Sequence, residues 1–535
     1  MPCWLAATPL AALPAPSVPA PPFRVGVEVP VNLPIVTSFE NALRDLGLGY
    51  VNFYVTNAPG FDLPELEVTG SMSALCERAG LDFALACHHR NPSAETIAAA
   101  ARSPRFQGVL VDEVEHIRLL FPQFAPIARE DLLADPSAFT AFEPAHDETV
   151  EGYRRLRERF TSQGAPRAIA THVWPSLLHA AARAGWTPCP KVCKEFYSPV
   201  SLAIGMGAAL QYGRDLWVDV DMWYFALVPG HPVEEVEANL QMAYWLGADL
   251  VYLEGCGYNL HPAGRQGVPF SLFSQIDDQR YQLTPHGEML KRFCRTYLPA
   301  NPRAHTFRDV LPTVAIVRFD DTDVGQKSWG APRLYGTERL APDAETAAWF
   351  GIWNVLTHGA TGRDGIAFFK ASIRHPTTEA GAHARLAPSY LSDPASAEHR
   401  FFVPLNGAVV YDHTVGYERL RGVPLLYATG KALSSATVEA LRRCVREGAT
   451  CVAWGPLAAR TGLARWEKGV KVVREGRGRW VLTDDFEAPA AVRPVKRFLG
   501  RPDEIRYRFG ERVVTLRRVT DNQVRVEVTP ASAAR

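Results

Sequence analysis

Short apolar runs alternate with amphipathic stretches from Phe23 to about residue 300. A run of four to eight residues rich in Val, Leu and Ile, bounded by turn residues, predicts a strand buried on both faces. Eight such runs occur: Arg24–Val29, Tyr50–Thr56, Phe83–His89, Gly108–Glu113, Arg167–Trp174, Lys191–Tyr197, Leu216–Trp223 and Leu250–Cys256. Eight strand-then-helix units in about 275 residues have the size and rhythm of a (β/α)8 barrel.

The stretches between these runs have the spacing of amphipathic helices, and several end in glycine, as at Gly80, Gly185 and Gly247. They are Ser38–Leu46, Ser71–Ala79, Ala94–Ala101, Thr149–Phe160, Pro175–Ala184, Val200–Tyr212 and Val233–Leu246, with Thr284–Tyr297 as a closing helix. Periodicity alone does not separate a barrel from a doubly wound sheet. The count of eight and the polar strand ends favour the barrel, which we expect over residues 23–302.

The pattern changes after Pro302. Strands are predicted at Leu311–Phe319, Gly407–Tyr411, Val423–Thr429 and Thr450–Trp454, and helices at Ala344–Thr357 and Ser435–Glu447. A capped helix, a glycine stop and a parallel strand are typical of a doubly wound α/β domain, which we place at residues 303–465. Five stretches after residue 466 alternate with a period of two, so residues 466–535 are expected to form a small antiparallel β domain: Lys471–Arg474, Arg479–Leu482, Glu504–Phe509, Val513–Arg518 and Gln523–Val528.

Composition excludes several classes of protein. The 57 basic and 57 acidic side chains cancel and form no basic stripe, so we expect no nucleic acid partner. No apolar run approaches the roughly 18 residues that span a bilayer, so no membrane partner is expected either. Residues 1–22 form an Ala/Pro-rich leader whose prolines interrupt any signal-like apolar region. A cytoplasmic location is favoured over a periplasmic or secreted one.

The nine cysteines do not form a disulfide framework in a chain of this length. The closest pair, Cys189 and Cys193, lacks the second cluster that a four-ligand zinc site would need. Most of the cysteines are expected to be reduced thiols in the core, and no cofactor is expected.

The ends of the predicted barrel strands carry acids, aromatic residues and histidines, although the strands are far apart in sequence. The carboxyl ends of barrel strands form one face, which is the functional face. The candidates there are His88, His89, Asp112, Glu113, His172, Trp174, Glu195, Tyr197, Asp219, Asp221, Trp223, Glu254 and Tyr258. Carboxylates interleaved with Trp and Tyr suit a sugar, because aromatic faces bind the apolar side of a pyranose and acids bind hydroxyls.

Cleavage of a glycosidic bond needs two carboxyl groups, one of which protonates the leaving oxygen. Glu113 is the first candidate for the acid because it ends a buried strand beside Asp112, and a neighbouring acid raises a carboxyl pKa. Its alternative role is a salt bridge to a neighbouring arginine. Glu254 and Glu195 are the candidates for its partner, with Asp221 as a further possibility. The remaining residues would bind substrate; Asp219 and Asp221 could instead be a buried pair neutralised by Lys or Arg.

Two alternative chemistries leave weaker traces in the sequence. The doublet His88 and His89 could belong to a metal site with His172, but the first strand offers no His-x-His companion, so no metal is expected. In the second domain, Cys451 lies inside a predicted strand and not on a strand-to-helix elbow. A working amidotransferase is therefore not expected there.

A barrel with acids at its strand ends, followed by a doubly wound domain and a small β domain, resembles the family 42 β-galactosidases and related clan A glycoside hydrolases. The resemblance implies a middle domain similar to a glutamine amidotransferase without its chemistry, and a homo-oligomer, a dimer or trimer. It also implies an acid/base Glu ending strand four, which Glu113 matches with Asp112 in place of Asn, and a nucleophilic Glu ending strand seven. By our count strand seven carries Asp219 and Asp221, while Glu254 falls on strand eight.

The sequence thus predicts a glycoside hydrolase that cleaves an oligo- or polysaccharide without a cofactor. The alternatives are a metal-dependent barrel hydrolase using His88, His89 and His172, and a catalytically silent carbohydrate-binding protein. The sugar, its anomer and the stereochemical course stay open.

Overall fold

The computed structural model describes residues 23–29, 37–56, 64–88, 90–115, 133, 135–193, 196–222, 231–255, 272–325, 333–362 and 401–531. Among its helices, none is both long and apolar enough to cross a bilayer. His89, Glu195, Trp223 and Tyr258, four of the predicted site residues, lie outside the described residues.

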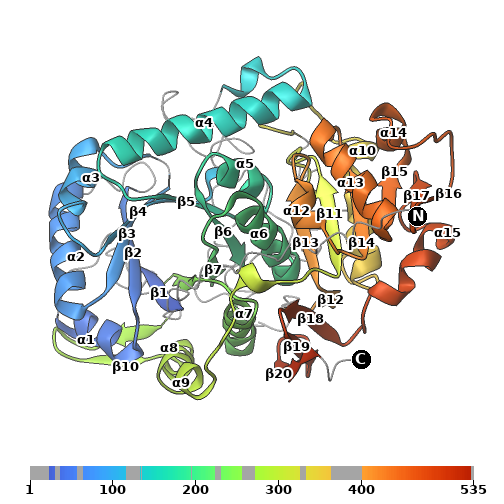
Figure 1. Cartoon of the computed structure of the whole chain (residues 1–535). Helices are drawn as coiled ribbons and strands as arrows, with labels where there is room; N and C mark the ends of the chain where they lie inside the picture. The colour runs from blue at the N-terminus through green and yellow to red at the C-terminus, as the bar shows by residue number, and fades with distance from the viewer. Residues whose placement is uncertain are drawn as a thin grey trace, which may run out of the picture.

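The N-terminal half is a closed barrel of eight parallel strands, which confirms the predicted fold class (Figure 1). Its strands are β1 (Arg24–Val29), β2 (Tyr50–Thr56), β3 (Asp82–Cys87), β4 (Phe106–Val111), β5 (Ala168–His172), β6 (Thr187–Val192), β7 (Trp217–Asp221) and β8 (Leu250–Glu254). The barrel closes where β1 pairs with β8 in parallel. Seven of the eight predicted runs coincide with strands, whereas β6 ends at Val192 and shares only its last two residues with the predicted run Lys191–Tyr197. Glu254 ends the eighth strand, as predicted.

The barrel helices are α1 (Thr37–Leu46), α2 (Glu65–Ala79), α3 (Ala94–Ala100), α4 (Phe142–Ser162), α5 (Leu178–Arg183), α6 (Ser198–Tyr212), α7 (Val233–Trp245) and α8 (Pro285–Arg292). A short hairpin, β9 (Phe273–Gln275) with β10 (Tyr281–Leu283), precedes α8. The closing helix continues from α8 through a π-helical turn at Phe293–Tyr297 into α9 (Leu298–Ala300). Helix α4 begins earlier than predicted because its polar first turns contribute little to the apolar periodicity.

The barrel interior is apolar in its lower layers. Residues that point inward include Tyr50, Leu110, Ile169, Trp217 and Tyr252, all buried. Successive strand residues face opposite sides, so inward positions recur every second residue. Continuing that alternation toward the carboxyl ends brings polar and charged side chains into the barrel, and these form the candidate site.

A second sheet of six strands follows, in the order β13-β11-β14-β15-β17-β16. It contains β11 (Val314–Arg318), β13 (Ala408–Asp412), β14 (Leu425–Thr429), β15 (Thr450–Trp454), β16 (Lys471–Glu475) and β17 (Gly478–Thr483). Only β16 is antiparallel to its neighbour. The accompanying helices are α10 (Ala344–Leu356), α12 (Tyr417–Leu420), α13 (Ser435–Glu447) and α14 (Gly455–Arg460).

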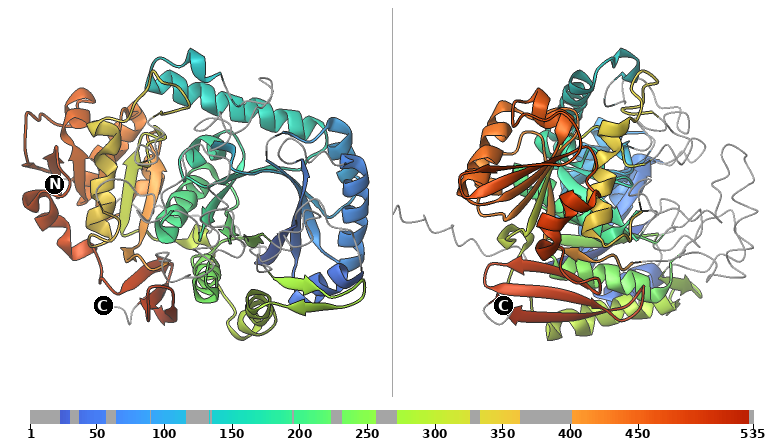
Figure 2. Two further views of the ribbon diagram at one scale, coloured as in Figure 1. Left: turned by 180° about the vertical axis from the view of Figure 1, so that it is seen from behind. Right: turned by 90° about the vertical axis from the view of Figure 1, so that its right-hand side faces the viewer.

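The third sheet has the order β12-β18-β19-β20. Its last three strands are drawn in red, near the C-terminus, in Figure 2. It contains β12 (Leu405–Asn406), β18 (Glu504–Phe509), β19 (Arg512–Arg518) and β20 (Val524–Pro530); α15 (Pro489–Val492) lies between the sheets in sequence. Two strands that we expected in this sheet, β16 and β17, belong to the middle sheet instead, where β17 pairs in parallel with β15. A period of two identifies a strand but not its partner.

Helix α6 lies between the barrel and the middle sheet (Figure 1). Every residue from Ser198 to Leu210 is buried, because one side of the helix packs on β6 and another on the edge strand β13. The approach is close: a Cβ on Gly207 would lie 1.5 Å from the carbonyl oxygen of Val410. His179 Nε2 also donates to that carbonyl, at 2.9 Å.

Candidate active site

Lys191 lies at the centre of a group of acids inside the carboxyl end of the barrel. Its Nζ is 2.5 Å from Glu254, 3.0 Å from Asp112, 3.1 Å from Glu113, 3.3 Å from Asp221 and 3.8 Å from Asp219, measured to carboxylate oxygens. The lysine side chain is fully buried. We call the five carboxyl groups and this ammonium the Lys191 cluster.

Strand alternation explains how this group forms. Lys191 faces inward two residues after Cys189 on β6, and Asp219 and Asp221 face inward on β7. Glu254 follows the inward Tyr252 by two residues on β8. The cluster therefore combines residues from separate βα units that lie side by side only when the barrel closes.

Glu113 reaches the cluster through an unusual backbone conformation. It follows β4 with a φ of 45°, a left-handed conformation that side chains with a Cβ rarely adopt. Its backbone N–H donates to Thr171 Oγ1 at 2.9 Å, and that hydroxyl donates to Asp112 Oδ1 at 2.5 Å. Such conformations persist where surrounding contacts impose them, and they concentrate at functional sites.

Hydrogen bonds from tyrosines and an amide hold the deeper acids. Tyr54 donates to Asp112 Oδ2 at 2.7 Å, and Tyr252 donates to Asp219 Oδ2 at 2.8 Å. Below them, the Asn52 side chain donates to Glu28 Oε2 at 3.1 Å. Because these donors are themselves buried, the carboxyl groups are fixed in orientation.

One ammonium cannot balance all the carboxyl groups around it, so some of them hold protons. Burial opposes ionisation of Asp112, but Lys191, His88 and the Thr171 hydroxyl together outweigh it and lower the pKa of that carboxyl. Burial raises the pKa of Asp219 to about 7, even with Lys191 nearby. Burial and the negative charge of Asp221 raise the pKa of Glu254 well above its usual range. Burial likewise raises the pKa of Glu28.

Lys191 stays charged. Burial alone would lower its pKa, but the surrounding carboxylates, Asp112 first and then Glu113, raise it well above the usual value. The cluster thus contains a permanent cation, ionised carboxylates and, on Glu254, a carboxyl group that keeps its proton to unusually high pH.

Only part of the cluster faces the opening of the barrel. The side chain of Glu113 is 11% exposed and that of Glu254 is 7% exposed, whereas Asp219 and Asp221 are fully buried. His88, 22% exposed, lies above Glu113, with Nε2 3.5 Å from Oε2. Glu113, Glu254 and His88 are thus the predicted site residues that a substrate could reach among those the structure describes.

Three other predicted residues are buried and make contacts with groups outside the Lys191 cluster. His172 is buried on the outer side of β5, with Nε2 3.0 Å from the hydroxyl of Tyr153 on α4, and burial lowers its pKa to about 3. It faces outward because Thr171, its neighbour in the strand, faces inward. Trp174 and Tyr197 follow β5 and β6 in sequence. The backbone N–H of Trp174 donates to Glu115 Oε1 at 2.8 Å. The backbone carbonyl of Tyr197 accepts hydrogen bonds in the first turn of α6.

Two groups in the described parts of the chain have donor atoms spaced for a metal ion. The first is Asp112, Asp219 and Glu254, which surround the Lys191 ammonium, so a cation already lies among them. The second is Cys193, His231 and Glu235. Of the residues in the predicted metal alternative, His172 contacts Tyr153 on α4 and not His88, and His89 lies outside the described residues.

Sequence reasoning missed Lys191 as a site residue, along with Glu28 and Tyr54. A signal was available: a lysine inside a run that is otherwise apolar is costly to bury unless acids neutralise it. The adjacent prolines, Pro188 and Pro190, hid the strand, so the run was expected to begin at Lys191 itself.

No family model and no curated protein matches the chain. Similar solved structures include the exo-β-1,4-mannosidase Op5Man5 of Opitutaceae bacterium strain TAV5, with 12% identity over 89% of this chain and 94% of that chain, and a TM-score of 0.42. GH5_18 of Streptomyces cattleya, in complex with GlcNAc, has 15% identity over 56% of this chain and 84% of that chain, with a TM-score of 0.40. A DAHP synthase of Thermotoga maritima also matches, with 10% identity over 52% of this chain and 69% of that chain, and a TM-score of 0.31.

Proposed function

We propose that the chain is a retaining glycoside hydrolase in which Glu254 is the acid/base and Glu113 is the nucleophile. The observation that carries this proposal is the pair itself: two carboxyl groups at the mouth of the barrel contact the same ammonium, and burial raises the pKa of one of them, Glu254. Residues with perturbed pKa values in such a position are candidates for acid/base catalysis.

The spacing of the pair supports retention. Lys191 Nζ is 3.1 Å from Glu113 Oε1 and 2.5 Å from Glu254 Oε2, so the two oxygens are separated by no more than the two contacts combined, 5.6 Å. Retaining enzymes have carboxyl groups about 5–5.5 Å apart, whereas inverting enzymes leave about 6.5–9.5 Å for a water molecule.

Electrostatics favour the reverse of the roles that the sequence suggested. We expected Glu113 to be the acid, but its contact with Lys191 favours the charged form, which a nucleophile needs. Glu254 is the member of the pair whose pKa is raised by burial and by Asp221, and a general acid must carry a proton at working pH. In this scheme Glu254 protonates the leaving oxygen while Glu113 attacks the anomeric carbon, and Glu254 then deprotonates the water that releases the sugar.

The test is hydrolysis of aryl glycosides and natural oligosaccharides by the wild type, Glu113→Gln and Glu254→Gln. Each variant is expected to lose at least about 100-fold in kcat/KM. Glu288→Gln, an exposed glutamate on α8, is the matched control and should keep wild-type activity. Substrates with very good leaving groups need no protonation, so they should restore Glu254→Gln far more than Glu113→Gln.

Azide distinguishes the two roles. With Glu254→Ala, azide should attack the glycosyl-enzyme and give a glycosyl azide of retained configuration. With Glu113→Ala it should attack the substrate directly and give the inverted azide. The opposite result would return Glu113 to the acid role, and an inverted product from the wild type would exclude the retaining scheme.

A second candidate is a carbohydrate-binding protein without turnover. The observation that favours it is the position of Lys191, which contacts both carboxyl groups and neutralises charge that catalysis would use. Calorimetric titration with the same oligosaccharides distinguishes the two functions. Binding to the wild type and to Glu113→Gln, with no hydrolysis by either, would support the silent protein and contradict the hydrolase.

A further inference from the structure

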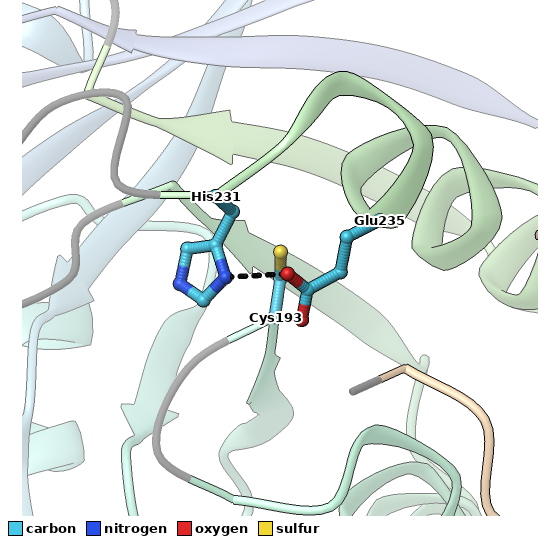
Figure 3. Close-up of side chains that lie close together, drawn as sticks. All are labelled: Cys193, His231 and Glu235. Carbon is cyan, nitrogen blue, oxygen red and sulfur yellow. Dashed lines mark hydrogen bonds and ion pairs between the residues drawn. The ribbon is translucent and has the colours of Figure 1, made fainter. Parts of the chain in front are cut away.

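A second group of donor atoms lies beside the Lys191 cluster and plays no part in the proposed hydrolysis. It consists of Cys193, one residue beyond β6, His231, just before α7, and Glu235, in the first turn of α7 (Figure 3). Each residue is almost completely buried, with exposed fractions of 1%, 4% and 4%. Two neighbouring βα units thus place a thiol, an imidazole and a carboxyl group together.

The three side chains converge on one point. His231 Nδ1 is 2.9 Å from Glu235 Oε2, and the ligand atoms of all three residues lie within 4.8 Å of one another. Zinc bonds of about 2.0–2.3 Å in a tetrahedron imply ligand atoms roughly 3.3–3.8 Å apart. Small side-chain movements would therefore bring all three donors onto one ion.

The orientation of the histidine argues against a cysteine nucleophile. In a catalytic pair, the sulfur faces one ring nitrogen and the orienting acid faces the other. In Figure 3, the sulfur of Cys193 lies on the side of the ring nitrogen that contacts Glu235, and the other nitrogen points away from both. The sulfur, this ring nitrogen and the carboxylate oxygen therefore face one another, as the ligands of a metal ion do.

We propose that Cys193, His231 and Glu235 bind a zinc ion. A thiolate and a carboxylate would together neutralise the two charges of the ion, so a buried site of this composition carries no net charge. Sulfur and imidazole ligands favour zinc over magnesium or calcium, which prefer oxygen. Three protein ligands leave a fourth position of the tetrahedron for water or another group.

The ion would join the segment after β6 to the start of α7. Cys193 follows Lys191 by two residues, so zinc would fix the end of the strand that carries the central lysine. Cys193 has a φ of 65°, a left-handed conformation, and its side chain packs with the core that surrounds the barrel. Cys189, its nearest cysteine in sequence, faces that interior and is not part of the group.

Zinc binding is measured directly. After removal of metals with a chelator, the full-length protein is titrated with Zn²⁺ against a chromophoric chelator, and bound zinc is counted by elemental analysis. One tightly bound zinc per chain is expected. Loss of a residue that only contacts a metal ligand weakens metal binding by roughly 10–100-fold. Glu235→Gln and His231→Gln each remove a ligand itself, so each should weaken zinc binding by more than this.

Cobalt identifies the sulfur ligand. Co²⁺ bound to the wild type should show a thiolate-to-metal charge-transfer band and the intense visible bands of a four-coordinate site. Cys193→Ser should lose the charge-transfer band, while Cys294→Ser, a control outside the group on the π-helical turn, should keep it. Glu235→Gln, which changes one atom, keeps the test informative if Cys193→Ser does not fold.

Two results would overturn the proposal. A wild-type protein that binds no zinc under these conditions would exclude the site. Zinc that binds as tightly to Cys193→Ser and Glu235→Gln as to the wild type, but is lost in Glu254→Gln, would assign the metal to the Lys191 cluster. Neither readout depends on hydrolysis, so failure of the proposed activity would leave the zinc measurement intact.

Discussion

Lys191 Nζ on β6 lies 2.5 Å from Glu254 Oε2 on β8, although the two residues are separated by a complete βα unit. This lysine contacts all five carboxyl groups of the cluster, so its removal would leave several buried carboxylates uncompensated. We expect Lys191→Met to lower the free energy of unfolding by about 3–5 kcal/mol. Urea unfolding at neutral pH measures the change.

The matched control is Lys291→Met on α8. Lys291 also contacts a carboxylate, with Nζ 2.7 Å from Asp45 Oδ1, but its side chain is 37% exposed. Surface pairs contribute about 0–1 kcal/mol, so this variant should unfold almost as the wild type does. Equal losses for the two lysines would contradict a central role for Lys191.

If Glu254 is the acid of the proposed hydrolysis, we expect Asp221 to set the alkaline limit of activity through its effect on Glu254. Its negative charge is the second cause, after burial, of the raised pKa of Glu254. Activity requires protonated Glu254, so kcat/KM falls as pH rises through that pKa. Asp221→Asn removes the neighbouring charge, lowers the pKa and should move the alkaline limb to lower pH. An unchanged limb with normal folding would exclude Glu254 as the acid.

Asp219 makes the stability of the protein depend on pH. The pKa of Asp219 is about 7 in the folded state and 3.8 when exposed. Between these pH values the folded protein keeps a proton on Asp219 that the unfolded chain has lost. The unfolded state binds fewer protons there, and stability from this group is therefore lost as pH rises from about 4 to 7.

Asp219→Asn tests this dependence because Asn can still accept the hydrogen bond of Tyr252. The Tm of the wild type minus that of the variant should decrease between pH 5 and pH 8. A difference that stays constant, or grows with pH, would show that Asp219 ionises normally in the folded chain.

Gly207 on α6 tests the contact between the barrel and the middle sheet. A Cβ there would overlap the carbonyl oxygen of Val410, which is backbone and cannot rotate away. Gly207→Ala should therefore destabilise the protein by about 1–3 kcal/mol or more. Gly70→Ala is the matched control: this glycine is also helical, on α2, but nothing lies within 4 Å, so alanine should stabilise by about 0.5–1 kcal/mol. Thermal unfolding of both variants gives the comparison.

The barrel could be predicted from sequence because its signal repeats eight times, and each strand needs only local alternation to be recognised. Strand β6 was the exception. Its sequence contains Pro188 and Pro190, and proline is disfavoured inside sheets because it lacks an N–H donor. The predicted strand therefore started too late and placed Lys191 at the wrong end of it.

The charges of the site could not be predicted from sequence. That Glu113 and Glu254 would be near each other followed from the strand ends, but their protonation depends on which groups surround them in space. The same holds for Cys193, His231 and Glu235, because no spacing within one segment joins them. The assignment of β17 to the middle sheet likewise depends on pairing with β15, which alternation does not encode.

The position of α6 has a practical consequence for dissecting the protein. An amphipathic barrel helix can face water once the rest of a chain is removed, but α6 is apolar on every side and its outer surface packs against β13. A barrel expressed alone as residues 23–302 would present that surface to solvent and tend to aggregate. We therefore expect the barrel to need the middle sheet in order to fold, and an inactive isolated barrel would not test its chemistry.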